Sequence, residues 1–119
     1  MACTVVIVDD HADFRAGAAK LLEAAGYAIV ASCADGRSAL DAITALRPDL
    51  VVLDVQLPDI DGFGVMAHVD TLAVSPTVVL ISTREAADYG DRVARSGAAG
   101  FITKADLSTA SLAEAVARR

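Results

Sequence analysis

The chain has 119 residues, of which 55% are hydrophobic and 4% aromatic, so it is long enough for one domain, over residues 1–119, and leaves little room for a second. The formal net charge is −6, and no cluster of Lys and Arg occurs apart from Arg118 and Arg119, which disfavours direct binding of nucleic acid by this chain. No apolar run approaches the roughly 20 residues that span a bilayer, and no basic stretch leads into an apolar one at the N-terminus, so we expect a cytoplasmic location without membrane contact.

Five short apolar runs, rich in Val and Ile, lack the polar alternation of a half-exposed strand. They cover residues 4–8, 28–31, 50–55, 77–81 and 100–102. Such runs are typical of strands buried on both faces of a parallel sheet. Cys3 precedes the first run and Cys33 follows the second, which places the two thiols near opposite ends of neighbouring strands. We therefore expect reduced cysteines and no disulfide.

Apolar residues at helical spacing fill the segments between these runs. Three helical faces are formed by Phe14, Ala18, Leu21, Leu22 and Ala25, by Leu40, Ile43 and Leu46, and by Val65, Met66, Val69 and Leu72. The second of these helices should end at Arg47, because Pro48 disfavours helical geometry in the residue before it.

Two more helices are predicted towards the C-terminus. One covers residues 85–96 and ends at Gly97, although its internal Gly90 lowers helix propensity by about 1 kcal/mol relative to Ala. The other begins near Ser108 or Thr109, which are both good N-cap residues. Strands that alternate with helices in this way predict an open parallel sheet with helices on both faces. In such folds the ligand site lies beyond the carboxyl ends of the strands.

Polar side chains follow the predicted strands at the point where each strand ends. The first strand runs into Asp9 and Asp10, the third into Asp54, the fourth into Ser82 and Thr83, and the fifth into Thr103 and Lys104. Carboxylates that converge repel one another unless a cation lies between them. Mg²⁺ suits such a site, because it binds through one or two carboxylates and keeps waters that a phosphate can replace. An aspartate beside Mg²⁺ and an ammonium group can act as a nucleophile towards phosphorus.

The motifs at these strand ends occur in a recognisable order. They are Val8-Asp9-Asp10-His11, Leu53-Asp54-Val55-Gln56-Leu57-Pro58-Asp59-Ile60-Asp61-Gly62, Ile81-Ser82 and Gly100-Phe101-Ile102-Thr103-Lys104. By these motifs the chain resembles, over essentially its whole length, the receiver domains of two-component response regulators. The Asp-Asp-His opening and the absence of proline after Lys104 look most like the NarL-type branch, whose members usually carry a C-terminal helix-turn-helix. The resemblance implies a flavodoxin-like (βα)₅ doubly wound parallel sheet with strand order 2-1-3-4-5.

The resemblance also implies a phosphorylation-dependent signalling switch, which catalyses only its own phosphorylation and dephosphorylation and is otherwise not an enzyme. Asp54 would be the phosphoacceptor, and a histidine kinase or phosphotransfer protein would supply the phosphoryl group. The cofactor would be Mg²⁺, bound directly by Asp10 and Asp54 and mainly through water by Asp9. The backbone carbonyl of Gln56 would be a further metal ligand.

Three more residues receive roles from the resemblance. Ser82 would be the switch hydroxyl and Lys104 the ammonium group that binds the phosphate. Phe101 matches the switch aromatic residue whose rotamer follows phosphorylation. The switch surface would be formed by the fourth and fifth helices with the fifth strand. Phosphorylation would promote a homodimer there, and a DNA-binding domain would lie outside this chain, beyond its C-terminus.

Two positions depart from the family pattern, and two more lie where the family tunes dephosphorylation. Ala105 stands where proline commonly follows the lysine, and we predict a trans bond because a cis bond before alanine would cost about 2.5–4 kcal/mol. Thr83 is larger than the usual residue after the switch serine, so its methyl group would narrow access to the site. Gln56 and Arg84 are the tuning positions. We expect Arg84 to reach the phosphoryl group or Gln56 and to slow attack by water.

Two alternative functions compete with the switch. A phosphatase of the haloacid dehalogenase kind also uses a strand-end aspartate and Mg²⁺, but it normally needs a second acid two residues after the nucleophile, where this chain has Gln56. The other alternative is a receiver-like module that binds a partner without being phosphorylated. The departures at Thr83 and Ala105 favour that module, and the intact set of acidic and lysine positions disfavours it.

Four other polar residues are expected to have structural positions. His11 and His68 are predicted in loops or on the surface, because no Cys/His grouping suggests zinc. Asp59 and Asp61 flank a Pro/Gly turn, and loop and helix-cap roles suffice for them.

Overall fold

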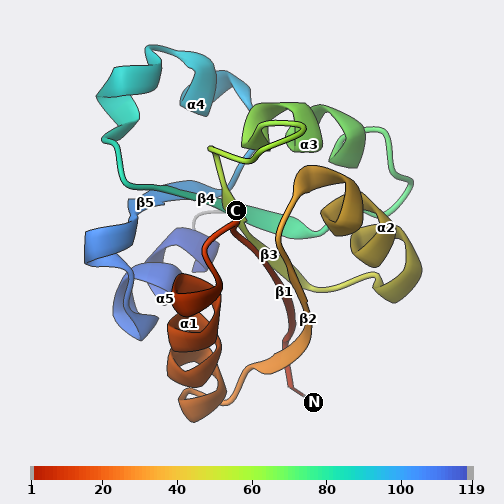
Figure 1. Cartoon of the computed structure of the whole chain (residues 1–119), viewed down its shortest axis with the longest axis vertical. Helices are drawn as coiled ribbons and strands as arrows, with labels where there is room; N and C mark the ends of the chain where they lie inside the picture. Colours follow the sequence, from red (N-terminus) through yellow and green to blue (C-terminus); the bar gives the residue numbers. More distant parts are fainter. Residues whose placement is uncertain (1, 118–119) are drawn as a thin grey trace.

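A five-stranded parallel sheet forms the centre of the computed structural model, which describes residues 2–117 (Figure 1). The strands are β1 Thr4–Val8, β2 Ala28–Cys33, β3 Leu50–Asp54, β4 Thr77–Ser82 and β5 Gly100–Thr103. Their order across the sheet is β2-β1-β3-β4-β5. The predicted fold class, strands and strand order are confirmed, with β2 longer than predicted by two residues.

Helices cover both faces of this sheet, α1 and α5 on one side and α2 and α3 on the other (Figure 1). The α-helices are α1 Ala12–Ala24, α2 Gly36–Leu46, α3 Gly62–Val69, α4 Arg92–Arg95 and α5 Thr109–Ala117. Two short 3₁₀ turns, η1 Ala86–Tyr89 and η2 Lys104–Asp106, complete the described elements. The chain is therefore doubly wound.

Two hydrophobic clusters, one on each face of the sheet, explain why the strands lack polar alternation. Val6 and Val8 of β1 pack in the cluster beneath α2 and α3. Val5 and Ile7 of the same strand pack in the cluster beneath α1 and α5. Because successive side chains of a strand point to opposite faces, a strand covered on both sides needs apolar residues at every position.

Three other features of the chain agree with the sequence. The helix α2 ends at Leu46, and Arg47 follows it in a left-handed conformation with φ 47°. The helix α5 begins at Thr109, and the backbone N–H of Ser111 donates to Ser108 Oγ at 3.0 Å, which caps its N-terminus. The two cysteines form no disulfide. Cys33 ends β2, whereas Cys3 lies before β1.

The prediction of one continuous helix over residues 85–96 is wrong. The segment forms the 3₁₀ turn η1, and then the short helix α4. Between them Gly90 has φ 63° and ψ −129°, a conformation that is essentially restricted to glycine. A capping box between Glu85 and Asp88 closes the first turn. Gly90 therefore does more than weaken the helix, because its backbone turns the chain out of helical geometry.

The start of α3 lies directly against the end of β3 at Gly62. Its backbone N–H donates to the carbonyl of Val55 at 2.8 Å. A Cβ at this position would lie 2.7 Å from the carbonyl oxygen of Asp54 and 2.8 Å from the Cα of Val55. Both obstacles are backbone atoms that cannot rotate away, so this close approach requires glycine.

Replacing Gly62 should therefore be costly, and the chain offers a matched control. Gly62→Ala should lower the free energy of unfolding by about 1–3 kcal/mol, because the added methyl group overpacks the junction. Gly17→Ala, in an exposed part of α1 with no atom within 4 Å of the new Cβ, should raise that free energy by up to about 1 kcal/mol through helix propensity. Urea denaturation measures both, and equal effects of the two substitutions would contradict the packing argument.

Candidate functional site

The carboxyl ends of four strands bring polar side chains to one edge of the sheet. Asp9 follows β1, Asp54 ends β3, Ser82 ends β4 and Lys104 follows β5. Ser82 lies close to Asp54 because Asp54 pairs with Ile81 of β4, and Ser82 is the next residue. Asp9, Asp54 and Ser82 are at most 2% exposed. The prediction that these polar groups share a common edge agrees with the structure.

Lys104 joins the two buried carboxylates. Its Nζ lies 2.5 Å from Asp9 Oδ2 and 3.2 Å from Asp54 Oδ2, and it also lies 4.7 Å from the centroid of the Phe14 ring. Burial alone lowers the pKa of Lys104, but the hydrogen bonds and charges of Asp9 and Asp54 outweigh it and raise that pKa above its usual value. The ammonium group is held in place although Ala105 stands where proline is common. The bond before Ala105 is trans, as predicted, because residues 2–117 contain no cis peptide bond.

Asp54 is a carboxyl group whose pKa is raised to about 6. Its burial is the main cause, because a charged carboxylate is poorly solvated there, and the negative charge of Asp9 adds to the effect. The backbone N–H of Gln56, which donates to Asp54 Oδ1 at 3.1 Å, and the ammonium of Lys104 act in the opposite direction. An additional positive charge beside Asp54 would therefore stabilise its charged form.

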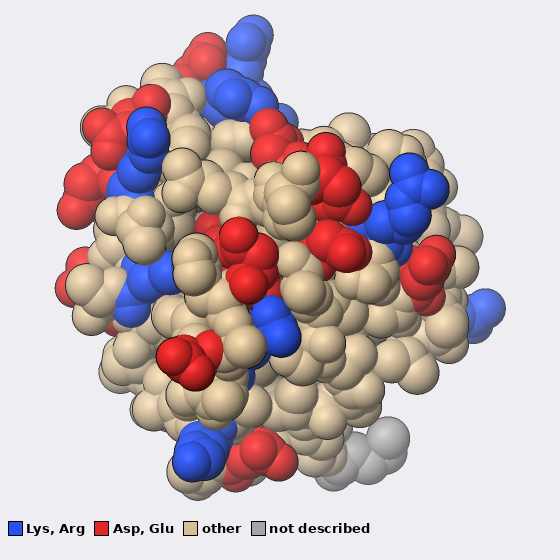
Figure 2. All heavy atoms as spheres, in the orientation of Figure 1, with Lys and Arg blue, Asp and Glu red and all other residues tan. Residues whose placement is uncertain are grey.

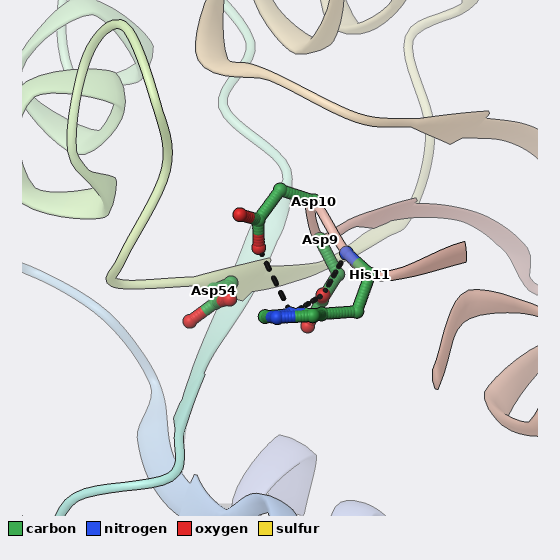
Figure 3. Close-up of side chains that lie close together, drawn as sticks. All are labelled: Asp9, Asp10, His11 and Asp54. Atoms are coloured by element: carbon green, nitrogen blue, oxygen red, sulfur yellow. Dashed lines mark hydrogen bonds and ion pairs between the residues drawn. The ribbon is translucent and has the colours of Figure 1, made fainter. Parts of the chain in front are cut away.

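His11 lies against the acidic pair, as Figure 3 shows. Its backbone N–H donates to Asp9 Oδ1 at 2.7 Å. Its ring Nδ1 lies 3.1 Å from the same oxygen and 3.0 Å from Asp10 Oδ1. The imidazole is exposed, as predicted, but these contacts were not predicted from the sequence. The adjacency of His11 to Asp9 and Asp10 is the signal that could have indicated them.

The side chains around Asp54 fit a hard divalent cation. One ligand atom from each of Asp9, Asp10, His11 and Asp54 lies within 4.8 Å of the others. Asp9 Oδ2 is buried, and it pairs with the ammonium of Lys104. Carboxylate oxygens that converge in this way are the ligands that Mg²⁺ or a similar ion uses.

Ser82 is buried and has two polar contacts among the described residues. Its Oγ accepts the backbone N–H of Arg84 at 3.0 Å and lies 2.7 Å from the hydroxyl of Tyr89. Phe101 is half-buried and meets the Tyr89 ring edge-on, with centroids 6.1 Å apart. The predicted tuning residues Gln56, Thr83 and Arg84 are exposed, next to the site.

Arg15 and Asp59 hold the loops around the site by contacts that the sequence does not indicate. Arg15 Nη1 donates to the backbone carbonyl of Asp9 at 2.6 Å, and its Nε donates to Ser32 Oγ at 3.0 Å. Asp59 accepts the backbone N–H groups of Gly36 and Arg37 at 2.7 and 2.9 Å. It therefore caps the start of α2 from a distant loop, and these hydrogen bonds lower its pKa to about 2.

Asp61 has the helix-cap position that the sequence predicts. The side chain of Asp61 accepts the N–H of Gly64 at 2.8 Å and caps α3.

On the face in Figure 2, basic side chains are scattered among acidic ones and form no continuous patch. Among the described residues, no helix is both long and apolar enough to cross a membrane.

Comparison with known proteins agrees with this site. The family model for the response regulator receiver domain matches residues 5–117. A putative transcriptional regulator of Pseudomonas aeruginosa is 35% identical over 100 residues, which are 84% of this chain and 48% of that protein. The DNA-binding transcriptional activator EvgA of Escherichia coli is 31% identical over 99 residues, which are 83% and 48% of the two chains. This chain therefore spans about half the length of these curated relatives.

Solved structures share the whole fold. The receiver domain of the putative response regulator NarL from Mycobacterium tuberculosis has a TM-score of 0.84 and 32% identity, covering 97% of both chains. A CheX–CheY–BeF₃–Mg²⁺ complex from Borrelia burgdorferi contains a chain with a TM-score of 0.84 and 25% identity, covering 95% of this chain and 85% of that one.

The fold and the strand-end site thus define a receiver domain, and the chain belongs to the response regulator receiver domain family of two-component systems. Among its members it is of the NarL type, as the opening Asp-Asp-His motif predicts.

The raised pKa of Asp54 predicts a gain in stability when its charge is removed. Its pKa rises from 3.8 to about 6 on folding, so between these values the folded state binds more protons and stability falls as the pH rises. Asp54→Asn should therefore raise the melting temperature at pH 7 without divalent cations, and the gain should vanish below about pH 4. A gain that did not change with pH would contradict the electrostatic cause.

Asp59 provides the opposite case. Its pKa falls from 3.8 to about 2 on folding, so its charge stabilises the protein above about pH 4, and this contribution is lost as the pH falls through about 2. Asp59→Asn should therefore lower the melting temperature at pH 7, and the difference from wild type should shrink towards pH 2. The same thermal unfolding series measures it. Stabilisation by Asp59→Asn at pH 7 would show that the cap on α2 has been misjudged.

Proposed function

We propose that this chain is the phosphorylation-dependent switch of a two-component system and that Asp54 accepts the phosphoryl group from a histidine kinase or phosphotransfer protein. The observation that carries the proposal is the position of Asp54. Its carboxylate is buried at the end of β3, 3.2 Å from the ammonium of Lys104, and it shares a cluster of ligand atoms with Asp9 and Asp10.

In this proposal the metal ion is Mg²⁺, held by Asp10 and Asp54, through water by Asp9, and by the backbone carbonyl of Gln56. When bound, the ion would offset the charge of the acidic cluster and of the transferring group. The Borrelia burgdorferi complex contains both Mg²⁺ and BeF₃. The similarity of its chain to this one supports testing the same pair of ligands here.

The side chains of this chain have distinct parts in the transfer. A carboxylate oxygen of Asp54 forms a bond to phosphorus while the bond from phosphorus to the donor nitrogen breaks, and that nitrogen keeps the electron pair. Lys104 stabilises the negative charge on the equatorial phosphoryl oxygens. Ser82 then donates its hydroxyl hydrogen to one of these oxygens. Phe101 is the switch aromatic residue of the proposal.

The alternatives receive less support. A phosphatase of the haloacid dehalogenase kind would need an acid where the exposed Gln56 stands. An interaction module that is never phosphorylated would have no need for two buried carboxylates and the lysine that joins them. Family membership makes a signalling switch, rather than an enzyme with its own substrate, the ordinary function of such a domain.

The remaining proposals concern the whole protein. Relatives about twice as long include a DNA-binding transcriptional activator, which supports a DNA-binding domain beyond residue 119 of this chain. We also propose a cytoplasmic location, the single receiver domain over residues 1–119, and a homodimer that forms on phosphorylation through the surface of α4, β5 and α5.

A direct test is phosphorylation by acetyl phosphate. The chain should gain the mass of one phosphoryl group with Mg²⁺ and none with EDTA, because the acidic cluster repels the donor without a cation. Asp54→Asn should abolish this gain, whereas Asp59→Asn, which removes a carboxylate only five residues away, should retain it. Intact-mass spectrometry measures all four samples. If neither acetyl phosphate nor beryllofluoride bound in a Mg²⁺-dependent way, the interaction module would be the better-supported function.

The exposed Arg84 predicts a change in the lifetime of the phosphorylated state. If its guanidinium reaches the phosphoryl group or Gln56 and slows attack by water, Arg84→Ala should shorten the half-life up to severalfold, because a solvent-exposed charged contact is worth about 0.2–1 kcal/mol. Loss of phosphate after removal of the donor measures the half-life, with the exposed Arg37→Ala as the control. An unchanged half-life for Arg84→Ala would rule out this role.

A further inference from the structure

Tyr89 contacts the hydroxyl group of Ser82, which the phosphorylated state is proposed to use. Its phenolic oxygen lies 2.7 Å from Ser82 Oγ, and its ring meets Phe63 and Phe101 edge-on at centroid distances of 5.6 and 6.1 Å. Phe101, the aromatic residue of β5, has no hydroxyl group and cannot hydrogen-bond to Ser82. The aromatic hydroxyl that contacts Ser82 is that of Tyr89 in η1. The ring and the hydroxyl of Tyr89 are thus both held inward.

The Ser82 hydroxyl is the donor in its contact with Tyr89. A serine hydroxyl has one hydrogen to donate and two lone pairs. The backbone N–H of Arg84 already uses one lone pair of Ser82. Ser82 is 0% exposed, and Tyr89 is its only other hydrogen-bond partner among residues 2–117. Buried hydroxyl hydrogens find an acceptor, so Ser82 donates its single hydrogen to Tyr89, whose own hydrogen can point to solvent.

A phosphoryl oxygen on Asp54 competes for that hydrogen. Such an oxygen is only an acceptor, so it requires the hydrogen that Ser82 now gives to Tyr89. Asp54 lies on β3, whereas Tyr89 lies on η1, which follows β4. The Ser82 hydroxyl has to rotate from one partner to the other, and the two bonds cannot coexist with the same hydrogen.

We propose that Tyr89 is a positioning residue that holds the Ser82 hydroxyl away from the phosphoryl site in the unphosphorylated state and is released when Asp54 is phosphorylated. This inference rests on the proposed function and deepens it. The segment that carries Tyr89 is suited to respond, because η1 and α4 are only four residues long each and are separated by the turn at Gly90. Release of Tyr89 would therefore transmit the state of Asp54 to the exposed segment between β4 and β5.

The composition of the chain provides a selective spectroscopic readout. It has two tyrosines and no tryptophan, so the variant Tyr27→Phe leaves Tyr89 as the only strong fluorophore. Titration of this variant with beryllofluoride and Mg²⁺ should change the tyrosine emission. Binding itself is followed independently by ¹⁹F NMR of the bound beryllofluoride. Binding without a change in emission would show that Tyr89 does not respond.

A double-mutant cycle tests whether Tyr89 acts through Ser82. Tyr89→Phe keeps the ring and removes the competing hydroxyl, so beryllofluoride affinity should increase roughly 2- to 12-fold, the equivalent of one ordinary hydrogen bond. In the Ser82→Ala background the same substitution should have no effect. Tyr27→Phe, the same chemical change at a distance from the site, should leave the affinity unchanged, and thermal unfolding checks that each variant is folded.

The outcomes separate this inference from the proposed function. Absence of Mg²⁺-dependent beryllofluoride binding in the wild type would overturn the proposed function, and this inference with it. Binding that Tyr89→Phe leaves unchanged, or weakens as a supporting relay would, overturns the inference alone. An equal gain in the presence and absence of the Ser82 hydroxyl also overturns it, because Tyr89 would then act through packing.

Discussion

The site depends on the ion pairs of Lys104 with Asp9 and Asp54. Two buried carboxylates beside each other would destabilise the fold, since each is costly to desolvate and each repels the other. One ammonium group between them offsets part of both penalties and fixes the end of β5 relative to β1 and β3. The raised pKa of Asp54 shows that this compensation is incomplete. The residual negative charge is what a divalent cation would neutralise, so the same imbalance that costs stability prepares the site for a ligand.

The packing of the sheet determines how precisely this arrangement is held. Both faces are covered by helices, and the strands therefore have no freedom to shift by one residue without moving apolar side chains into the wrong layer. The close approach at Gly62 fixes the start of α3 to the end of β3 in the same way. Asp59 and Arg15 then connect the loops at the rim to α2 and β2. Packed backbone elements thus fix the strand ends, and this fixes the positions of the site side chains that the strand ends carry.

Much of this could be predicted from the sequence. The apolar runs located the strands, and parallel strands bring their carboxyl ends to one edge, which was enough to group Asp9, Asp54, Ser82 and Lys104. The strand order came from the family resemblance, because local patterns carry no information about which strands are neighbours. Helix caps at Ser108 and Asp61 followed from residue type alone.

What could not be predicted depends on contacts between distant segments. The cap that Asp59 provides for α2 and the bond from Arg15 to the backbone of Asp9 require the loops to be placed first. The helix expected over residues 85–96 failed for a local reason, since Gly90 supplies a positive φ that the average propensity scale does not represent. Tyr89, whose hydroxyl lies 2.7 Å from Ser82 Oγ, is the last residue of the turn before that break.

The exposed connection between β4 and β5 has a consequence for how such a domain diversifies. The residues proposed for the chemistry lie at strand ends, where replacement disturbs the fold as well as the site. The short turns that follow Ser82 contain no residue of the buried core between residues 83 and 97. Apart from Arg84 and Tyr89, new recognition sequences can therefore arise there at little cost to folding, so the domain can acquire different partners over evolutionary time while its chemistry stays the same.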